Sequence, residues 1–182
     1  MKIVFALCLL VVVYSCSNGP ESETEYISYI EEVEDSLNKM STDASQQKMY
    51  TETQQRYLNT LIEFYQKYPK SKDADRSLDK VHMIYSGMGD YENSVKWADT
   101  LLMNYPKYVN RAMVLESQAN SYDVFLQPRD TTMVRKYYTM LLNEFPLMDK
   151  TKRADIQDRL KHNKLTLEQY MSLQVIEPEL IN

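Results

Sequence analysis

The side chains that could carry out chemistry are few and scattered in this chain. Its two histidines, His82 and His162, stand far apart in the sequence, and neither has a cysteine near it. A metal site needs several ligands at short, defined spacing. The sequence therefore predicts no metal site and no cofactor. We expect His82 to pack on the inner side of its helix and His162 to be solvated near a helix C-terminus.

Carboxylates and serines give no catalytic pattern either. Glu31, Glu32 and Glu34 could form an acid and base pair, but on an amphipathic helix such residues usually make up the solvated face. General acid and base catalysis requires burial that shifts a pKa. The serines show no nucleophile elbow. We therefore expect no catalytic residue and no enzyme activity.

Composition narrows the fold class and the partners. The chain has 182 residues, of which 43% are hydrophobic and 26% charged, and this suits one globular domain. Only three glycines are present, which argues against a turn-rich β protein and against a phosphate-binding loop. The formal net charge is −5 without runs of like charge, whereas nucleic acid binding needs clustered Lys and Arg. We expect no nucleic-acid partner.

The N-terminus carries a targeting signal. Lys2 precedes an unbroken apolar run, residues 3–13, which suits a signal peptide and is too short to span a bilayer as a helix. Ser15 then precedes Cys16. This arrangement resembles a bacterial lipoprotein signal, in which the cysteine becomes lipidated.

That resemblance implies a signal peptide over residues 1–15 and an acylated Cys16, with palmitate as a typical acyl chain. Residues 16–25 are polar, contain Gly and Pro, and are expected to form a flexible stalk. Once Cys8 is removed with the signal, Cys16 is the one cysteine left, so no disulfide can form within the mature chain. A plain secretory signal and an uncleaved anchor stay open as alternatives.

Residues 26–171 are expected to form helices. Apolar residues recur there at intervals of three and four, which is typical of one face of a helix: Tyr26, Ile30, Val33, Leu37 and Met40. Three helices are predicted to end at an aromatic residue followed by Pro69, Pro106 or Pro146, because proline cannot continue a helix and restricts the residue before it. Residues 172–182 are expected to form a loose tail.

Two successive units repeat along the chain. Each predicts a helix, a turn and a second helix, with Gly89 in the first turn and with Asp90 and Asp130 at the N-cap positions of the second helices. The later unit carries about three extra residues in its turn, within the segment LQPRDT. A fixed period with an insertion confined to a turn predicts an array of helical hairpins.

These units resemble the tetratricopeptide repeat. Leu78, Val81, Tyr85 and Pro106 fit its motif by residue type, and the segment 89–91 fits its turn. The resemblance implies an all-α fold: a short tetratricopeptide-like helical-hairpin solenoid after a lipoprotein signal peptide.

The same motif implies which side chains line the inner face of the array. Counting along it gives a groove lined by the first helix of each hairpin, namely Arg76, Asp79, Met83, Met113, Glu116 and Asn120. Five tyrosines are expected to fill the seams between hairpins instead: Tyr65, Tyr68, Tyr85, Tyr105 and Tyr122. The groove lacks the Lys and Arg needed to clamp the carboxylates of a C-terminal peptide tail.

The lipoprotein signal and the aromatic-proline endings together are similar to outer-membrane lipoproteins of the Bacteroidetes type. They are distantly similar to the repeat lipoprotein of the outer-membrane protein assembly machine. The resemblance implies a lipid-anchored protein on the periplasmic side of the outer membrane. We expect an envelope protein-protein interaction module, an adaptor or accessory subunit of a membrane complex, with no small-molecule substrate.

Other functions stay open at this point. A component of the outer-membrane protein assembly machinery, an envelope hydrolase or glycan-binding protein, and a structural spacer are the alternatives. The sequence also leaves open the partner, the oligomeric state and the membrane leaflet. The helix over 26–40 either packs on the array or projects from it to bind a partner, because either arrangement buries its apolar stripe.

Overall fold

The computed structural model describes residues 19–40 and 44–176, and these parts of the chain are helical with short connections and no strand. The helices, in chain order, are α1 (Glu23–Met40), α2 (Gln47–Lys67), α3 (Ala74–Gly87), α4 (Tyr91–Asn104), α5 (Arg111–Asn120), α6 (Thr131–Glu144), α7 (Lys150–Lys161) and α8 (Leu167–Ile176). A 3-10 turn (Ala44–Gln46) precedes α2, and a π-helical turn (Ser121–Phe125) follows α5. The expected all-α fold is confirmed. Residues 1–15 and Cys16 lie outside the described residues.

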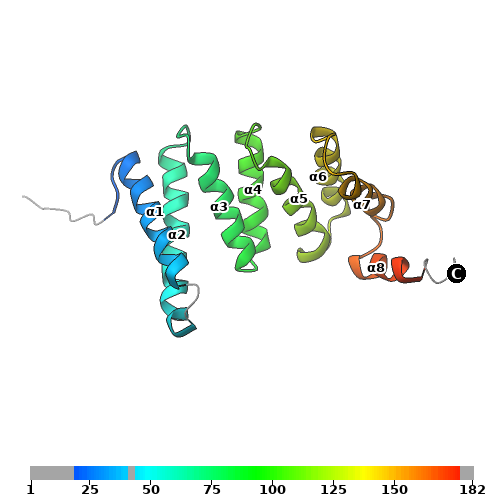
Figure 1. Cartoon of the computed structure of the whole chain (residues 1–182), viewed down its shortest axis with the longest axis horizontal. Coiled ribbons are helices and arrows are strands. Elements are labelled where there is room, and N and C mark those ends of the chain that lie inside the picture. The colour runs from blue at the N-terminus through cyan, green and yellow to red at the C-terminus, as the bar shows by residue number, and fades with distance from the viewer. Residues whose placement is uncertain (1–18, 41–43, 177–182) are drawn as a thin grey trace, which may run out of the picture.

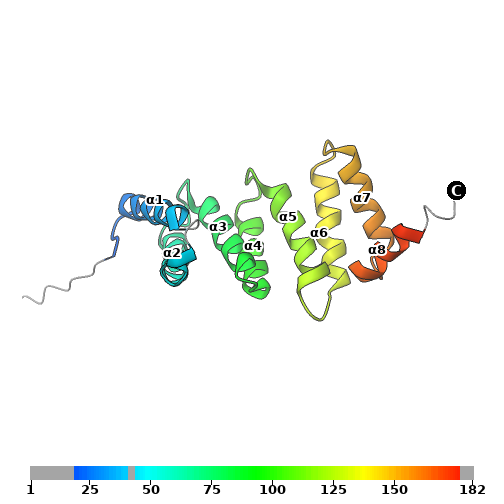
Figure 2. The same ribbon diagram turned by 60° about the horizontal axis from the view of Figure 1, so that its bottom comes forward.

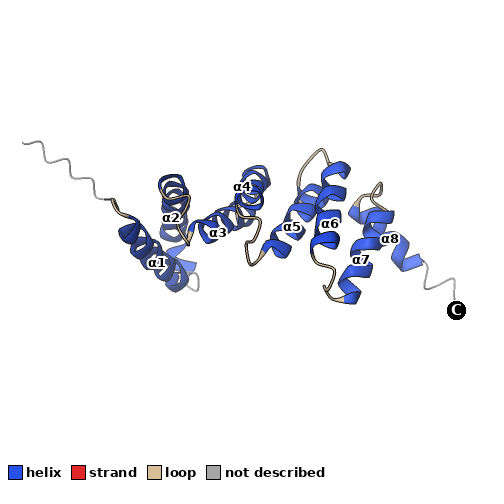
Figure 3. Cartoon of the chain, turned by 90° about the horizontal axis from the view of Figure 1, so that it is seen from above, coloured by secondary structure: helices blue, strands red, loops and turns tan. Residues whose placement is uncertain are grey.

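The helices follow one another as antiparallel hairpins along an elongated molecule, with the described N-terminal end and the C-terminal end at opposite tips (Figure 1). Figure 2 shows the same succession after a turn about the long axis. Seen from above, α1 and α3 lie on one side, and α2 and α4 lie on the other (Figure 3). The first helices of successive hairpins are therefore neighbours, which is the arrangement of a helical-hairpin solenoid.

The stripe on α1 packs on the array. Its five apolar residues, at positions 26, 30, 33, 37 and 40, are all buried, and they join a core with Leu61 and Phe64 of α2 and with Val81 of α3. A second core runs from Leu78 of α3 to Ile156 of α7. Trp97 of α4 packs against both cores. Each hairpin therefore shares its apolar surface with the next, and none closes a core alone.

The boundaries of the solenoid differ from the expected 26–171 at both ends. Helix α1 begins at Glu23, within the predicted stalk. The cause is a reciprocal capping box: the Glu25 carboxylate accepts hydrogen bonds from the backbone N–H groups of Glu21 and Ser22, while Ser22 Oγ accepts one from the Glu25 N–H. At the other end, α8 continues through Ile176 and so includes residues 172–176 of the predicted loose tail.

A capping box also starts α8. The Thr166 N–H donates to the Gln169 side chain, and the Gln169 N–H donates to the Thr166 hydroxyl. The remaining residues of the predicted tail, 177–182, lie outside the described residues.

The aromatic-proline corners join neighbouring hairpins. The Tyr105 hydroxyl donates to the Pro69 carbonyl at 2.5 Å, and the Tyr65 hydroxyl accepts from Asn104 Nδ2 at 2.9 Å. The Tyr68 hydroxyl donates to the Glu21 carbonyl at 3.1 Å. The five predicted seam tyrosines are half-buried and pack against the two cores. Their rings fill the seams, and the Tyr65 and Tyr105 hydroxyls bond across the seam between the first two hairpins.

The two hairpin turns are built differently. Between α3 and α4 the chain turns at Gly89 with φ of 78°, a conformation that suits glycine, and Asp90 Oδ1 accepts from the Asn93 N–H. Between α5 and α6 the π-helical turn adds residues, the Gln127-Pro128 peptide is cis, and Asp130 accepts from two N–H groups at the start of α6. Both predicted N-caps are confirmed, and the insertion lies in the turn.

Candidate functional site

The six residues predicted to line an inner groove lie on two neighbouring first helices. Arg76, Asp79 and Met83 are on α3, and Met113, Glu116 and Asn120 are on α5. Met83 is 58% exposed and Met113 is 65% exposed. These two methionines are the groove residues that offer apolar surface to a partner.

Asp79 is held inside the protein. Its carboxylate accepts from the Tyr108 hydroxyl at 2.7 Å, and His82 Nε2 lies 3.3 Å away. Burial by itself raises the pKa of Asp79, but the hydrogen bonds from His82 and Tyr108 outweigh burial and hold that pKa below its ordinary value. Asp79 therefore fastens α3 to the α4–α5 connection.

Two residues of α5 are also engaged within the chain. Glu116 pairs with Lys152 of α7 at 2.6 Å. Asn120 Oδ1 accepts from the Tyr138 hydroxyl of α6 at 2.8 Å. The predicted residues therefore do not form one continuous groove. Instead, hollows lie on either side of them, one between α1 and α3 and one between α5 and α7.

The α1–α3 hollow is a cavity of about 240 Å³ that receives side chains from α1, α2 and α3. Its apolar walls are Leu37, Tyr50, Met83 and Ile84. Tyr57 of α2 also lines it. Of the six predicted residues, Met83 borders this hollow.

A salt bridge crosses the groove between α1 and α3. Lys80 Nζ lies 2.5 Å from Glu34 Oε2, and both side chains are partly exposed. The two residues line the α1–α3 hollow and also a smaller cavity of about 70 Å³ that includes Arg76. The ion pair therefore divides the groove into two parts.

Tyr57 is the unusual polar group of the α1–α3 hollow. The residue is 5% exposed, and its hydroxyl is buried without a hydrogen-bond partner among the described residues. Burial raises the pKa of Tyr57, and the nearby Glu34 carboxylate raises it further. The Glu34 carboxylate acts on the hydroxyl through its charge and as a nearby acceptor, but it is bonded to Lys80 and lies outside strict hydrogen-bond geometry from Tyr57.

The α5–α7 hollow, of about 380 Å³, has a more polar lining. Glu116, Lys152, Asp155 and Arg159 border it, together with apolar parts of Tyr138, Ile156 and Tyr170. Several of these polar groups are already bonded. Glu116 and Lys152 bond each other, and the Arg159 guanidinium is used by its buried partners.

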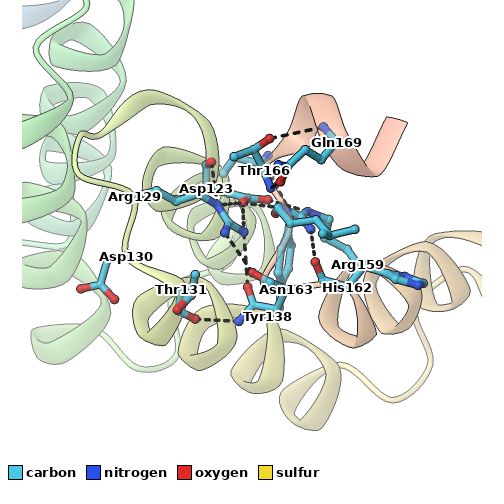
Figure 4. Close-up of polar contacts among 12 residues, drawn as sticks. Asp123, Arg129, Asp130, Thr131, Tyr138, Arg159, His162, Asn163, Thr166 and Gln169 are labelled. Atoms are coloured by element: carbon cyan, nitrogen blue, oxygen red, sulfur yellow. Dashed lines mark hydrogen bonds and ion pairs between the residues drawn. The ribbon is translucent and has the colours of Figure 1, made fainter. Parts of the chain in front are cut away.

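A buried ionic cluster lies behind the α5–α7 hollow. Arg159 of α7 donates two hydrogen bonds to the Asp123 carboxylate, at 2.8 and 2.7 Å, and Arg129 Nε donates to the same carboxylate at 2.7 Å. Asp123, in the π-helical turn, has a side chain that is 2% exposed. The two arginines come from different segments and converge on it (Figure 4).

Further hydrogen-bond donors of the cluster bond main-chain carbonyls. Arg129 Nη1 donates to the Asn163 carbonyl, and Arg159 donates to the carbonyls of His162 and Leu165. Asn163 Nδ2 donates to the Thr131 carbonyl at the start of α6. The cluster thus ties the inserted turn to both ends of the α7–α8 connection. Because the charged groups of the cluster bond one another and nearby carbonyls, we interpret the cluster as a structural contact between hairpins.

Each histidine lies beside an aspartate about one helical turn earlier in the chain. His82 is buried beside Asp79, as expected of a packing residue, and its Nδ1 lacks a partner among the described residues. His162 caps α7 at partial exposure, with Nδ1 3.1 Å from the Asp158 carbonyl oxygen. In residues 19–40 and 44–176, no group of three or more His, Cys, Asp or Glu could hold a metal ion.

Sequence reasoning missed the polar residues that distinguish the two hollows. No sequence pattern marks Tyr57, because a sequence does not show whether a buried hydroxyl has a hydrogen-bond partner in the folded protein. Arg129 lies within the inserted segment and Asp123 lies just before it, so the insertion was a signal for unusual structure at that place. The partner Arg159 lies 36 positions after Asp123, which no local pattern connects.

The chain matches no protein-family model, no curated protein and no solved structure. Within the described residues, no helix has the length and apolar character to cross a membrane.

Proposed function

We propose that this chain is a protein-binding helical-repeat module, an adaptor or accessory subunit of a membrane complex. The observation that carries the proposal is the α1–α3 hollow, an apolar-walled cavity of about 240 Å³ between the first helices of two packed hairpins. Exposed Met83 borders it, and exposed Met113 stands on the next first helix. Methionine is adaptable and polarizable and is enriched at binding surfaces.

The mechanism is a preorganised surface. The cores on both sides of α3 hold its backbone in place, so binding orders few groups of this chain. A helix or an extended segment of the partner lies along the inner face and places an apolar side chain in the hollow. The partner bears most of the ordering entropy, and the shape of the hollow selects among partners.

The membrane location is part of the proposal. Acylation of Cys16 tethers the module at the periplasmic side of the outer membrane, and residues 17–22 form the link to α1. More than one acyl chain gives stable anchoring. Confinement at the membrane raises the local concentration of the module near membrane complexes.

Membership of the tetratricopeptide repeat family is proposed on the residue pattern and the hairpin order. The motif residues Leu78 and Tyr85 lie on the first helix of one hairpin, Gly89 makes its turn and Pro106 follows its second helix. The next hairpin keeps the order of the motif, with about three extra residues in its turn.

The test is affinity purification of the full chain from native membranes in mild detergent, read by quantitative mass spectrometry. Met83→Glu and Met113→Glu place a charge on the inner face at exposed positions. Met103→Glu is the matched control, because Met103 is 79% exposed and lies on α4, a second helix. We expect the two inner-face variants to lose a near-stoichiometric partner that wild type and Met103→Glu retain.

A Cys16→Ala variant tests the anchor in the same experiment. It is expected to leave the membrane fraction and to lose the partner by dilution. Equal recovery of partners by all variants would refute the inner face as the binding surface. The identity of the partner then decides between a general adaptor and a component of the outer-membrane protein assembly machinery.

A further inference from the structure

Among the residues that the structure describes, the Tyr57 hydroxyl has no hydrogen-bond partner, whereas the hydroxyls of other buried tyrosines are bonded. Tyr26 bonds Glu63 and Lys67, and Tyr137 bonds Asp99. A buried hydroxyl without a partner destabilises the free protein. Such a group at a cavity wall is explained when a ligand supplies the missing bond.

The α1–α3 hollow has the size for one large side chain. An apolar cavity of about 150 Å³ accommodates a benzene molecule, and this hollow is larger, at about 240 Å³. Its walls of Leu37, Tyr50, Met83 and Ile84 suit an apolar body. The polar groups at its border, Tyr57 among them, suit a polar tip on that body.

The cover over Tyr57 is movable. Lys80 Nζ lies 5.9 Å from the centre of the Tyr57 ring, on its face, and pairs with Glu34 at partial exposure. A partly exposed ion pair is worth about 0–1 kcal/mol. An entering side chain can therefore displace Lys80 with a small loss of free energy and reach the Tyr57 hydroxyl.

We propose that the α1–α3 hollow binds an aromatic side chain with a polar tip, a tyrosine or a tryptophan, presented by a partner protein, and that the tip forms a hydrogen bond with the Tyr57 hydroxyl. This inference rests on the proposed protein-binding function and names the chemistry of the anchor residue. Tyrosine and tryptophan combine an apolar body with one hydrogen-bonding group, and they are frequent anchors of protein interfaces. Gln54, also at the hollow, has a side-chain amide that can bond the main chain of the same segment.

The experiment compares two probes that differ by one hydroxyl, N-acetyl-tyrosinamide and N-acetyl-phenylalaninamide. Each is titrated into the full chain in detergent, wild type and Tyr57→Phe, with ¹³C-methyl methionine labelling. Met83 reports binding in the hollow, and exposed Met113 on α5 reports nonspecific contact. Detergent micelles absorb the same share of each probe in the wild-type and the Tyr57→Phe samples. The ratio of the two probe affinities can therefore be compared between the two proteins.

The wild type is expected to bind the tyrosine amide about three- to tenfold more tightly than the phenylalanine amide, the range of one hydrogen bond. In Tyr57→Phe this ratio falls to about one. Saturation shifts appear at Met83 and not at Met113. A ratio that Tyr57→Phe leaves unchanged, absence of a Met83 shift, or equal shifts at both methionines would overturn the proposal.

Stability of the free protein gives a second readout. Tyr57→Phe removes an unpaired hydroxyl, so its unfolding midpoint is expected to equal or exceed that of wild type. Tyr26→Phe is the control, because it removes a hydroxyl with two partners and is expected to lower the midpoint. A fall in Tyr57→Phe as large as that in Tyr26→Phe would show that the hydroxyl serves the fold and would overturn the proposal.

The two proposals fail separately. Loss of the partner in Met83→Glu without a probe ratio that depends on Tyr57 leaves the protein-binding function standing and removes the aromatic anchor. A probe ratio that depends on Tyr57, with a partner indifferent to Met83 and Met113, shows that the hollow prefers a hydroxyl-bearing ring but refutes its use by a protein partner on the inner face.

Discussion

Two of the ionic contacts between successive hairpins differ in burial. At the N-terminal end, Glu34 and Lys80 join α1 to α3 across an open groove, and both side chains are partly exposed. At the C-terminal end, Asp123 joins Arg129 and Arg159 with its side chain 2% exposed. The first contact is exposed to water, and the Tyr57 hydroxyl beneath it has no hydrogen-bond partner in the described part of the chain. The second is closed and satisfied.

The difference separates a surface suited to binding from a joint that holds the fold. A partly exposed ion pair is screened by water and contributes little. Buried charges, once desolvated, depend on each other, so removal of one partner is costly. The C-terminal hairpin docks with little apolar surface, since α7 contributes only Ile156 and Leu160 to the main core. The ionic cluster supplies further contacts that hold this hairpin in place.

The largest effect is expected from Asp123→Asn. This change leaves Arg129 and Arg159 buried without a countercharge, and the free energy of unfolding is expected to fall by about 3–5 kcal/mol. Urea unfolding measures the loss, and amide exchange is expected to rise first in α7 and α8. Asp155→Asn, at an exposed position on α7, serves as control and is expected to change stability by less than about 0.5 kcal/mol. A loss below about 1 kcal/mol for Asp123→Asn would contradict the role of the cluster.

The same substitution is expected to have different effects at two tyrosines. Tyr137→Phe removes a buried hydroxyl that bonds the Asp99 carboxylate, and about 1.5–3 kcal/mol of unfolding free energy is expected to be lost. Tyr57→Phe is expected to cost nothing. Chemical denaturation of both variants measures the two changes in unfolding free energy. Equal losses would show that the Tyr57 hydroxyl contributes to stability as much as the bonded Tyr137 hydroxyl.

Asp79, between the two ends, is expected to make stability depend on acidity. Its pKa is lower in the folded protein than in the unfolded chain, so the stability it contributes is present above the unfolded pKa of about 3.9. That stability is lost as the pH falls through the folded pKa. The contribution is expected to be on the order of 1 kcal/mol or less, because water partly screens the group.

The measurement is urea unfolding at pH 6 and at pH 3. Wild type is expected to lose more stability between these values than Asp79→Asn, which has no carboxylate to protonate at this position. Identical losses in the two proteins would show that other carboxylates account for the acid sensitivity.

The smallest effect is expected from Lys80→Met, which breaks the exposed ion pair while keeping the length of the side chain. The unfolding free energy is expected to change by less than about 1 kcal/mol. The tyrosine amide probe is expected to bind at least as tightly as to wild type, because the side chain that covers Tyr57 is no longer held in place by an ion pair with Glu34. A stability loss comparable to that of Asp123→Asn would mean that the N-terminal contact is a joint as well.

Much of the fold follows from local signals in the sequence. The prolines after α2, α4 and α6 end those helices whatever surrounds them, because proline lacks the N–H that a helix interior needs. Asp90 and Asp130 cap their helices through hydrogen bonds to N–H groups two or three residues away. The stripe on α1 follows from periodicity alone. Such features lie within a few residues, so a pattern can reveal them.

The sequence pattern predicted only part of the candidate site. The motif places Met83 and Met113 on first helices, and the structure shows both exposed. It also places Asp79, Glu116 and Asn120 there, but the structure bonds each of them to a residue 18 to 36 positions away. Whether a polar side chain on a helix face is available to a partner depends on its neighbours in space.

The sequence by itself determined the helices, their ends and their order as hairpins, because caps, prolines and apolar periodicity act over one or two turns of chain. The tertiary structure alone decided which polar groups are satisfied. Asp123 meets Arg159 only when α7 docks, and the Tyr57 hydroxyl, covered by its neighbours in the fold, finds no partner in residues 19–40 and 44–176. Burial and hydrogen bonding are properties of assembled surfaces, and no single segment of the sequence encodes them.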